Sequence, residues 1–314
     1  MDRDDLELFQ RGLDHATGSC TGAELDAALE ELGWGEALVT ERQAAVSTLF
    51  DLQGRANATS SAVAAVVIES LGAGSGCGVV LPSLGSCAAP GVISDVRILV
   101  RGIATSTMTS APTMLVVAAD GDEQVGVVVE TQELLIRPVQ GLDPSLDLVE
   151  VTGNVGVLSR SSVDWSLAVR RGQLALSHEL IGASRAMLEI ACQHALERIQ
   201  FAVPISSFQA VRHRLAETLV AIETAQAMVG EAWEDDDPQT TAMAKALAGR
   251  GARTTARHCQ QVLAGIGFTL EHRFHHYFRR VLVLDELFGS ARVLTRQLGE
   301  QLIQTRQLPP VLPL

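Results

Sequence analysis

The sequence predicts an α+β protein in which a small sheet domain separates two helical parts. In the first 75 residues, and again from residue 159 onward, apolar residues recur three or four positions apart, which is the helical period. Between residues 76 and 158 they form short β-branched runs separated by turn residues. Since 47% of the 314 residues are hydrophobic, the chain has enough apolar material for two or three packed layers.

Residues 1–75 are expected to form an N-terminal helical domain. The helical period is carried by Leu6, Phe9 and Leu13 and then by residues 24–32 and 46–71. Gly33, Trp34 and Gly35 interrupt this pattern, and glycine commonly ends a helix. We therefore predict several short helices that pack closely through alanine-rich faces.

Residues 76–158 are expected to form a small antiparallel sheet domain. The four candidate strands lie at residues 96–100, 114–118, 125–129 and 134–136. Turn residues separate them at Asp120-Gly121-Asp122 and at residues 141–144. Residues 70–94 contain no charged residue. Glycine, serine and proline nevertheless interrupt this stretch too often for a membrane helix.

Residues 159–314 are expected to form a bundle of four long helices. Three apolar stripes run through residues 180–195, 208–229 and 284–302. One helix should begin at Asp237-Pro238, because aspartate caps helix N-termini and proline fits the first turn. We expect Pro309 and Pro310 to end the last stripe.

The formal charge of −13 argues against general binding to nucleic acid or to an anionic membrane. Any anion site must therefore be local. Four arginine groups could supply one: Arg170-Arg171, Arg212 with Arg214, Arg250 with Arg253 and Arg257, and Arg279-Arg280. The acidic start lacks the pattern of a signal peptide, which predicts a cytoplasmic protein. Five scattered cysteines without a CxxC pair predict neither disulfides nor a thiolate metal site.

Two stretches about sixty residues apart place hydrogen-bond donors next to helix ends. In the first, Arg198 and Gln200 can reach phosphate oxygens and Phe201 offers an apolar support. In the second, Gln261 precedes Gly265 and Gly267, where missing side chains would let a ligand come close. Both stretches suit a phosphate-rich ligand.

With these residues the chain resembles an acyl-CoA dehydrogenase of the actinobacterial kind. The family pattern R-x-QFG-x-PI-x-x-FQ-x-x-x-H is matched from Arg198 to His213, with Gln209 in place and Ala202 where glycine is usual. The pattern Q-x-x-GG-x-G-[FY]-T-x-E is matched from Gln261 to Glu271, with Ala264 replacing the first glycine. The resemblance implies the corresponding fold, with a shortened N-terminal helical domain.

The resemblance also implies a reaction, the α,β-dehydrogenation of an acyl-CoA. A glutamate removes the α proton, FAD takes the β hydride, and electrons pass to an electron-transfer flavoprotein. In most members this base lies 27 residues after the motif glutamine, a position occupied here by Phe288. In the other subgroup it lies 26 residues before the motif arginine, a position occupied here by Gly172. Neither residue can accept a proton.

The family's aromatic strand that holds the flavin ring is also unmatched. In the family the two motifs reach across a dimer interface to a neighbour's FAD. The resemblance thus implies a non-catalytic subunit of a heterotetrameric enzyme, whose FAD site is shared with a larger acyl-CoA dehydrogenase subunit and whose substrate is a bulky, steroid-derived acyl-CoA. The residues expected to bind FAD are Arg198, Gln200, Phe201, Gln209, Gln261 and Gly265.

Three alternatives stay open at this point. The chain could be a self-sufficient homomeric dehydrogenase that uses Glu286 or Glu179 as an unusual base, or a flavin-free scaffold or CoA-thioester binding protein with the same fold. A metal site at His272, His275 and His276 has suitable helical spacing but no carboxylate partner, so we expect no metal. Asp285 and Glu286, like Arg279 and Arg280, are expected to be surface or interface charges.

Overall fold

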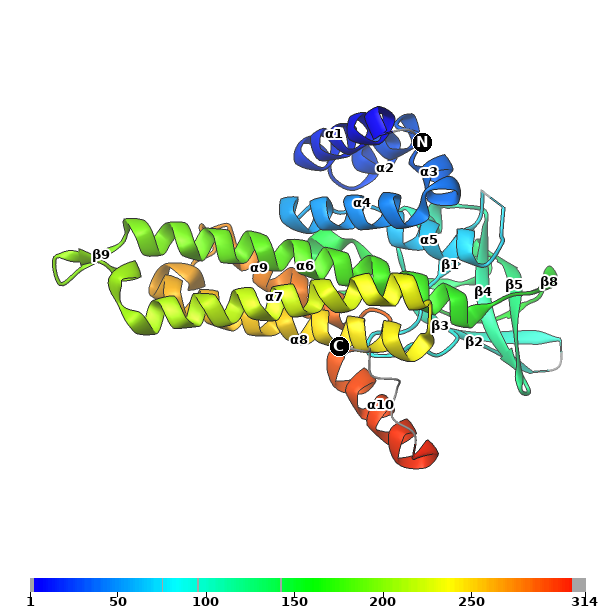
Figure 1. Ribbon diagram of the computed structural model, residues 1–314. Helices are drawn as coiled ribbons and strands as arrows, with labels where there is room; N and C mark the ends of the chain where they lie inside the picture. The colour runs from blue at the N-terminus through cyan, green and yellow to red at the C-terminus, as the bar shows by residue number, and fades with distance from the viewer. Residues whose placement is uncertain (1–2, 75, 95, 142, 307–314) are drawn as a thin grey trace.

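The computed structural model describes residues 3–306 except residues 75, 95 and 142. Helices precede the sheet, and longer helices follow it (Figure 1). The N-terminal helices are α1 (Arg3–Ser19), α2 (Ala23–Glu31), α3 (Trp34–Thr40), α4 (Arg42–Ala56) and α5 (Ala62–Ser70). As predicted, a glycine ends a helix here: Gly33 follows α2 with a left-handed φ of 69°.

Helix α4 joins the N-terminal helices to the rest of the protein. It packs on α6 (Trp165–Glu197) through two glycines. A Cβ on Gly54 of α4 would lie 2.2 Å from the carbonyl oxygen of Glu179, and one on Gly182 of α6 would lie 2.1 Å from that of Asp51. The two helix backbones therefore touch, and larger side chains would force them apart.

The strands are β1 (Gly78–Val80), β2 (Gly91–Ser94), β3 (Arg97–Thr105), β4 (Thr113–Asp120), β5 (Glu123–Glu130), β6 (Leu135–Pro138), β7 (Leu148–Gly156) and β8 (Ser159–Ser162). They form one sheet in the order β6-β7-β3-β2-β4-β5-β8, and β1 also pairs with β4. The expected turn at Asp120-Gly121-Asp122 joins β4 to β5, with Gly121 at φ 61°.

Most strand pairs of this sheet are antiparallel, as expected, but the sheet also contains parallel pairs. Both β1 and β2 run parallel to β4, in register with its beginning and its end respectively. They act as one interrupted strand, because residues 82–89 leave the sheet between them. This loop reaches the helical bundle, where the amide of Gly85 donates to the carbonyl of Glu286 and the carbonyl of Cys87 accepts from the indole of Trp165.

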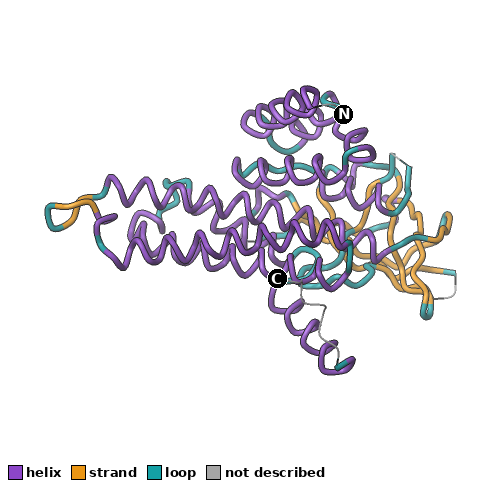
Figure 2. The backbone as a smooth tube through the Cα atoms, in the orientation of Figure 1, coloured by secondary structure: helices purple, strands orange, loops and turns teal. Residues whose placement is uncertain are grey.

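The C-terminal helices are α6, α7 (Gln209–Asp235), α8 (Pro238–Leu263), α9 (Phe274–Glu286) and α10 (Ala291–Thr305). Helices α6, α7 and α8 lie side by side along the bundle, whose one end meets the sheet (Figures 1 and 2). Asp237 caps α8 as predicted, since its carboxylate accepts from the amides of Gln239 and Thr240.

The expected fourth long helix is instead two short ones. Residues 287–290 interrupt the last apolar stripe, and both Phe288 (φ 53°) and Gly289 (φ 91°) adopt left-handed backbone conformations that end α9. Helix α10 then turns away from the bundle and packs on α8 (Figure 1). The apolar spacing in the sequence continues across the break and therefore does not reveal it.

Arg280 is a buried clamp, contrary to the expectation of a surface charge. Only 1% of its surface is exposed. Its guanidinium binds Asp143 of the sheet domain, donates to the carbonyl of Ala58 and the hydroxyl of Thr59, and lies 3.7 Å from a carboxylate oxygen of Glu179. One side chain on α9 thus connects the N-terminal helices, the sheet and α6.

In the part of the chain that the structure describes, no helix is both long and apolar enough to cross a membrane.

Candidate functional site

The first motif stretch forms a small hairpin at the end of the bundle that lies away from the sheet (Figure 2). Strands β9 (Ile199–Gln200) and β10 (Val203–Pro204) pair across a two-residue turn. Phe201 and Ala202 occupy this turn at φ 52° and 65°, a pattern that favours glycine and asparagine. The glycine that is usual at position 202 in the family pattern would relieve this backbone strain.

The second motif stretch ends α8 at the same end of the bundle. Ala264, which also replaces a usual glycine, has φ 51° and ψ −133°, a conformation that is costly for any residue with a Cβ. Gly267 is buried, and a Cβ there would lie 3.0 Å from that of Leu263. Gly265 instead faces open space. A ligand could therefore come close at Gly265, whereas Gly267 serves packing.

The polar candidates at this end are not engaged within the chain. Among the described residues, the side chains of Arg198, Gln200 and Gln261 form no hydrogen bond or ion pair. Gln209, the first residue of α7, contacts only the ring of His213, at 3.3 Å. Apolar side chains here are exposed as well, with Phe201 at 89% and Phe268 at 71%. Free donors beside exposed aromatic rings indicate an interaction surface.

The two positions where the family pattern places a base meet in the structure. The ring of Phe288 lies over Gly172 of α6: a Cβ on Gly172 would be 3.1 Å from two of its ring carbons. The ring is 1% exposed and packs against Trp165, with ring centroids 6.3 Å apart. The space is therefore filled by a hydrocarbon ring that can neither accept a proton nor admit a substrate.

The backbone around Phe288 is held from two sides. Gln173 Nε2 donates to the carbonyl of Phe288 at 3.0 Å. Lys245, the only lysine of the chain, donates its buried Nζ to the carbonyls of Asp285 at 3.0 Å and Gly289 at 3.3 Å. Burial lowers the pKa of Lys245 to about 8. These bonds maintain a left-handed Phe288, which is unfavourable for an aromatic residue.

The acidic residues considered as alternative bases are engaged with arginines. Glu179 is 1% exposed, and burial raises its pKa although nearby Arg280 opposes this. Glu286 pairs with Arg253 at 3.0 Å. Asp285, expected at the surface, is 1% exposed; it pairs with Arg253 at 2.5 Å and accepts from the amide of Ala291.

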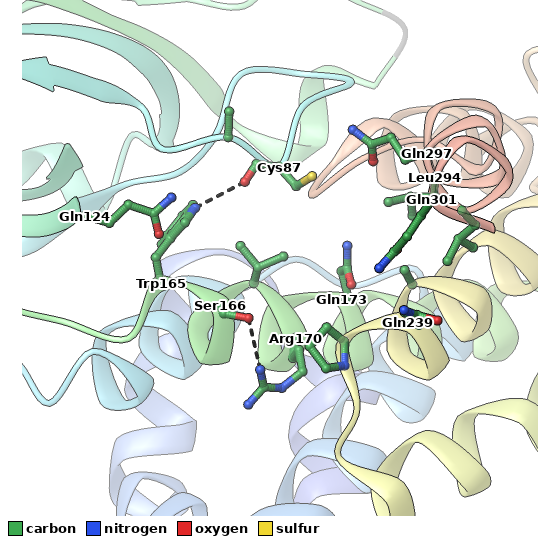
Figure 3. Close-up of a pocket in the computed structure, with 15 residues that line it drawn as sticks. Cys87, Gln124, Trp165, Ser166, Arg170, Gln173, Gln239, Leu294, Gln297 and Gln301 are labelled. Carbon is green, nitrogen blue, oxygen red and sulfur yellow. Dashed lines mark hydrogen bonds between the residues drawn. The ribbon is translucent and has the colours of Figure 1, made fainter. Parts of the chain in front are cut away.

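A separate cavity of about 330 Å³ lies where the 82–89 loop meets α6, α8 and α10 (Figure 3). Five glutamines line it, namely Gln124, Gln173, Gln239, Gln297 and Gln301. Trp165 forms one wall and donates its indole N–H to the carbonyl of Cys87. Arg170 at the rim is engaged with Asp236 and Ser166. The free cysteine Cys87 also lines the cavity, and burial raises the pKa of its thiol, so the lining is mainly amide groups with one protonated thiol.

The histidines at 272, 275 and 276 do not assemble a metal site. His272 and His275 bond to neighbouring backbone groups, and His275 stacks on His276 with centroids 3.8 Å apart. Over residues 3–306, with the gaps given above, no group of three or more histidine, cysteine, aspartate or glutamate side chains could hold a metal ion.

Sequence reasoning missed three residues of this region. Trp165, Gln173 and Lys245 all touch the Phe288 segment, yet none belongs to a motif. A lone lysine inside an apolar helical pattern is the only signal that could have drawn notice, because a buried amine requires several acceptors.

Taken together, fold and site define a protein of acyl-CoA dehydrogenase architecture. Over 96% of its length the chain superimposes on a Tcur3481-Tcur3483 steroid ACAD variant with a TM-score of 0.80 and 19% identity, covering 99% of that chain. It superimposes over 99% on the ChsE4-ChsE5 complex from Mycobacterium tuberculosis, with a TM-score of 0.79, 17% identity and 99% of that chain covered. At these identities the likeness shows the fold.

Residues 161–303 match the family described as acyl-CoA dehydrogenase, C-terminal domain. Two curated relatives are named acyl-CoA dehydrogenase IpdE2. The one from Mycobacterium tuberculosis is 36% identical over 126 residues, 40% of each protein; the one from Mycolicibacterium smegmatis is 28% identical over 59% of this chain and 57% of that protein. The matches therefore span less than two thirds of either relative.

Proposed function

We propose that the chain is a non-catalytic subunit of a heteromeric acyl-CoA dehydrogenase, and that its bundle end completes the FAD site of a larger partner subunit. One observation carries the non-catalytic assignment: the Phe288 ring fills the space over Gly172, where both family base positions converge. Dehydrogenation needs a carboxylate beside the acidic C–H of the acyl group. A partner must supply it.

The shared FAD site is supported by the composition of the bundle end. Arg198, Gln200 and Gln261 are donors without partners in the described chain, and Gly265 leaves open space beside them. Such donors fit the pyrophosphate and adenine half of FAD. Phe201, exposed at the tip of the hairpin, would be covered by the partner. When bound, the flavin would accept the hydride from the acyl-CoA. This chain would only hold and orient the flavin.

Relatives support a heteromeric enzyme and a bulky substrate. Two structural neighbours are named as two-component assemblies, and one of these names specifies a steroid ACAD. We infer a steroid-derived acyl-CoA as substrate class, with an electron-transfer flavoprotein as the electron acceptor. A cytoplasmic location stays a prediction. A self-sufficient enzyme is less well supported, because Glu179 and Glu286 are paired with arginines away from the Phe288 ring.

The test is to purify the chain alone and together with a dehydrogenase-like partner encoded beside it. We expect flavin only in the complex, at one FAD for each pair of chains. In that complex Arg198→Ala and Gln261→Ala should release FAD, whereas Arg137→Ala, an exposed change on β6, should not. Retained flavin in the first two variants would contradict the shared site.

Two further outcomes separate the alternatives. A yellow, active protein from the chain alone would show a self-sufficient dehydrogenase. A complex without flavin would favour a scaffold or a CoA-thioester binding protein. Phe288→Glu should not create activity in the isolated chain, since it places a carboxylate in an apolar, filled site rather than rebuilding a substrate pocket.

A further inference from the structure

A polar cleft of about 480 Å³ opens where the N-terminal helices α1 and α4 meet α6 and α7 (Figure 1). Of the nine residues that line it, only Leu52 is apolar. Each of the four helices contributes at least one polar side chain, among them Asp14 from α1, Thr48 and Asp51 from α4, His178 from α6 and Gln226 from α7. A lining of this kind suits a polar ligand, because polar groups that leave water need hydrogen-bond partners.

The cleft contains a hydrogen-bond donor that the protein leaves without an acceptor. His178 is 4% exposed, and its Nε2 accepts from the indole of Trp233 at 3.0 Å. In the neutral ring the proton is therefore on Nδ1. Because Trp233 is not part of the lining, the edge of the ring that bears Nδ1 is left to face the cleft. Among the described residues nothing accepts from this N–H, so an entering acceptor would satisfy a costly buried donor.

The charges around the cleft leave one carboxylate without a counter-charge. Asp51 is paired twice, with Arg55 at 2.6 Å and with Arg185 at 2.8 Å. Arg185 also donates to the amide oxygen of Gln226 at 3.4 Å. The carboxylate of Asp14, in contrast, forms no ion pair or hydrogen bond within the part of the chain that the structure describes. With two aspartates and one arginine, the lining has a formal net charge of −1.

We propose that this cleft binds a small aliphatic amine that also carries hydroxyl groups, such as an amino sugar. The ammonium group pairs with Asp14, the carboxylate that lacks a partner. A hydroxyl oxygen accepts from Nδ1 of His178, and further hydroxyls bond to Thr48 and to the amide N–H of Gln226. A free amino acid fits less well, because its carboxylate would meet an acidic lining whose Arg185 is already engaged.

This site is independent of the proposed function, since none of its residues belongs to the motif stretches at the bundle end. The test is calorimetric titration of the full-length chain with glucosamine at about pH 6, where an aliphatic amine is protonated. His178, whose pKa burial lowers to about 4, is neutral there. N-acetylglucosamine keeps the hydroxyls without the charge, and ethylamine keeps only the charge. We expect glucosamine to bind about tenfold or more tightly than either.

Asp14→Asn should abolish the preference for glucosamine over N-acetylglucosamine, because it removes the charge and keeps the shape of the side chain. The matched control is Glu24→Gln on α2, an exposed change outside the cleft that should leave binding unchanged. Thermal melting shows whether both variants are folded. In nitrogen NMR of the natural protein, the Nδ1–H signal of His178 should shift with glucosamine but not with ethylamine.

The comparison of the three probes needs no variant, so it decides the question even if a substitution unfolds the chain. No binding of glucosamine, equal affinity for all three probes, or an unmoved His178 signal would overturn the proposal. Equal weakening by Asp14→Asn and Glu24→Gln would do the same, since it would mean that glucosamine is attracted only by the overall negative charge of the protein.

Discussion

The aromatic ring of Phe288 rests on Gly172, so the two positions where the sequence patterns lead us to expect a base are in contact with each other. A Cβ at Gly172 would come within 3.1 Å of two ring carbons. A larger residue at position 172 would therefore press against the ring of Phe288. Conversely, the ring fills the space that the missing side chain of Gly172 leaves free.

Gly172→Ala should lower the free energy of unfolding by about 1 kcal/mol, because overpacking against a pinned ring outweighs the gain in helix propensity. In a Phe288→Ala background the sign should reverse, since the added methyl group then enters a cavity. Urea denaturation of the four proteins measures this coupling. Gly230→Ala on α7, where a Cβ meets nothing within 4 Å, is the control and should stabilise by about 0.5–1 kcal/mol. Additive effects would contradict the contact.

Ala202→Gly and Ala264→Gly should each raise stability by about 1 kcal/mol, because both alanines hold left-handed backbone conformations. Ala216→Gly, at an exposed position inside α7, should instead lose about 1 kcal/mol. Differential scanning calorimetry distinguishes these outcomes. If all three variants lose stability to the same extent, the backbone at Ala202 and Ala264 is not strained.

Arg280→Met should cost about 3–5 kcal/mol, since it leaves Glu179 and Asp143 without their buried cation. Adding Glu179→Gln should recover part of the loss, because an uncompensated carboxylate is then removed from the core. Arg279→Met, on the neighbouring residue, is the control with a small expected effect. Guanidinium denaturation gives the values, and an Arg280→Met protein as stable as the control would contradict the clamp.

His178 should make the protein sensitive to acid. It is buried and accepts a hydrogen bond at Nε2 from the indole of Trp233 at 3.0 Å, which requires the neutral ring. Burial lowers its pKa from 6.5 to about 4. Between those two values the unfolded chain binds more protons, so stability present above pH 6.5 is lost as the pH falls, by at most about 1.4 kcal/mol per unit.

His178→Gln should flatten this part of the stability profile while keeping an acceptor for Trp233. Replacement of the exposed His15 by glutamine should leave the profile unchanged. Denaturation midpoints measured from pH 4 to pH 7 test this pair, and an unaltered slope in the His178 variant would refute the assignment.

Much of the fold could be predicted because its signals are local. The helical period, the β-branched runs and the Asp237-Pro238 start of α8 depend on residues close in sequence, and the structure has each of them. The parallel pairing of β1 and β2 with β4 could not be predicted, because strand direction depends on where the 82–89 loop goes. The break at Phe288 was hidden because apolar spacing continues through it.

The sequence alone led us to predict a phosphate-binding role for the motif residues, and it places Phe288 and Gly172, which cannot take a proton, where the resemblance puts the family's base. Only the tertiary structure decided that Phe288 and Gly172 touch, that Arg280 and Lys245 are buried, and that polar residues from four helices line one cleft. Sequence motifs and hydrophobic periodicity depend only on residues that are close together along the chain. Contacts between distant residues depend on how helices cross and where loops return, and these follow from packing of the whole molecule.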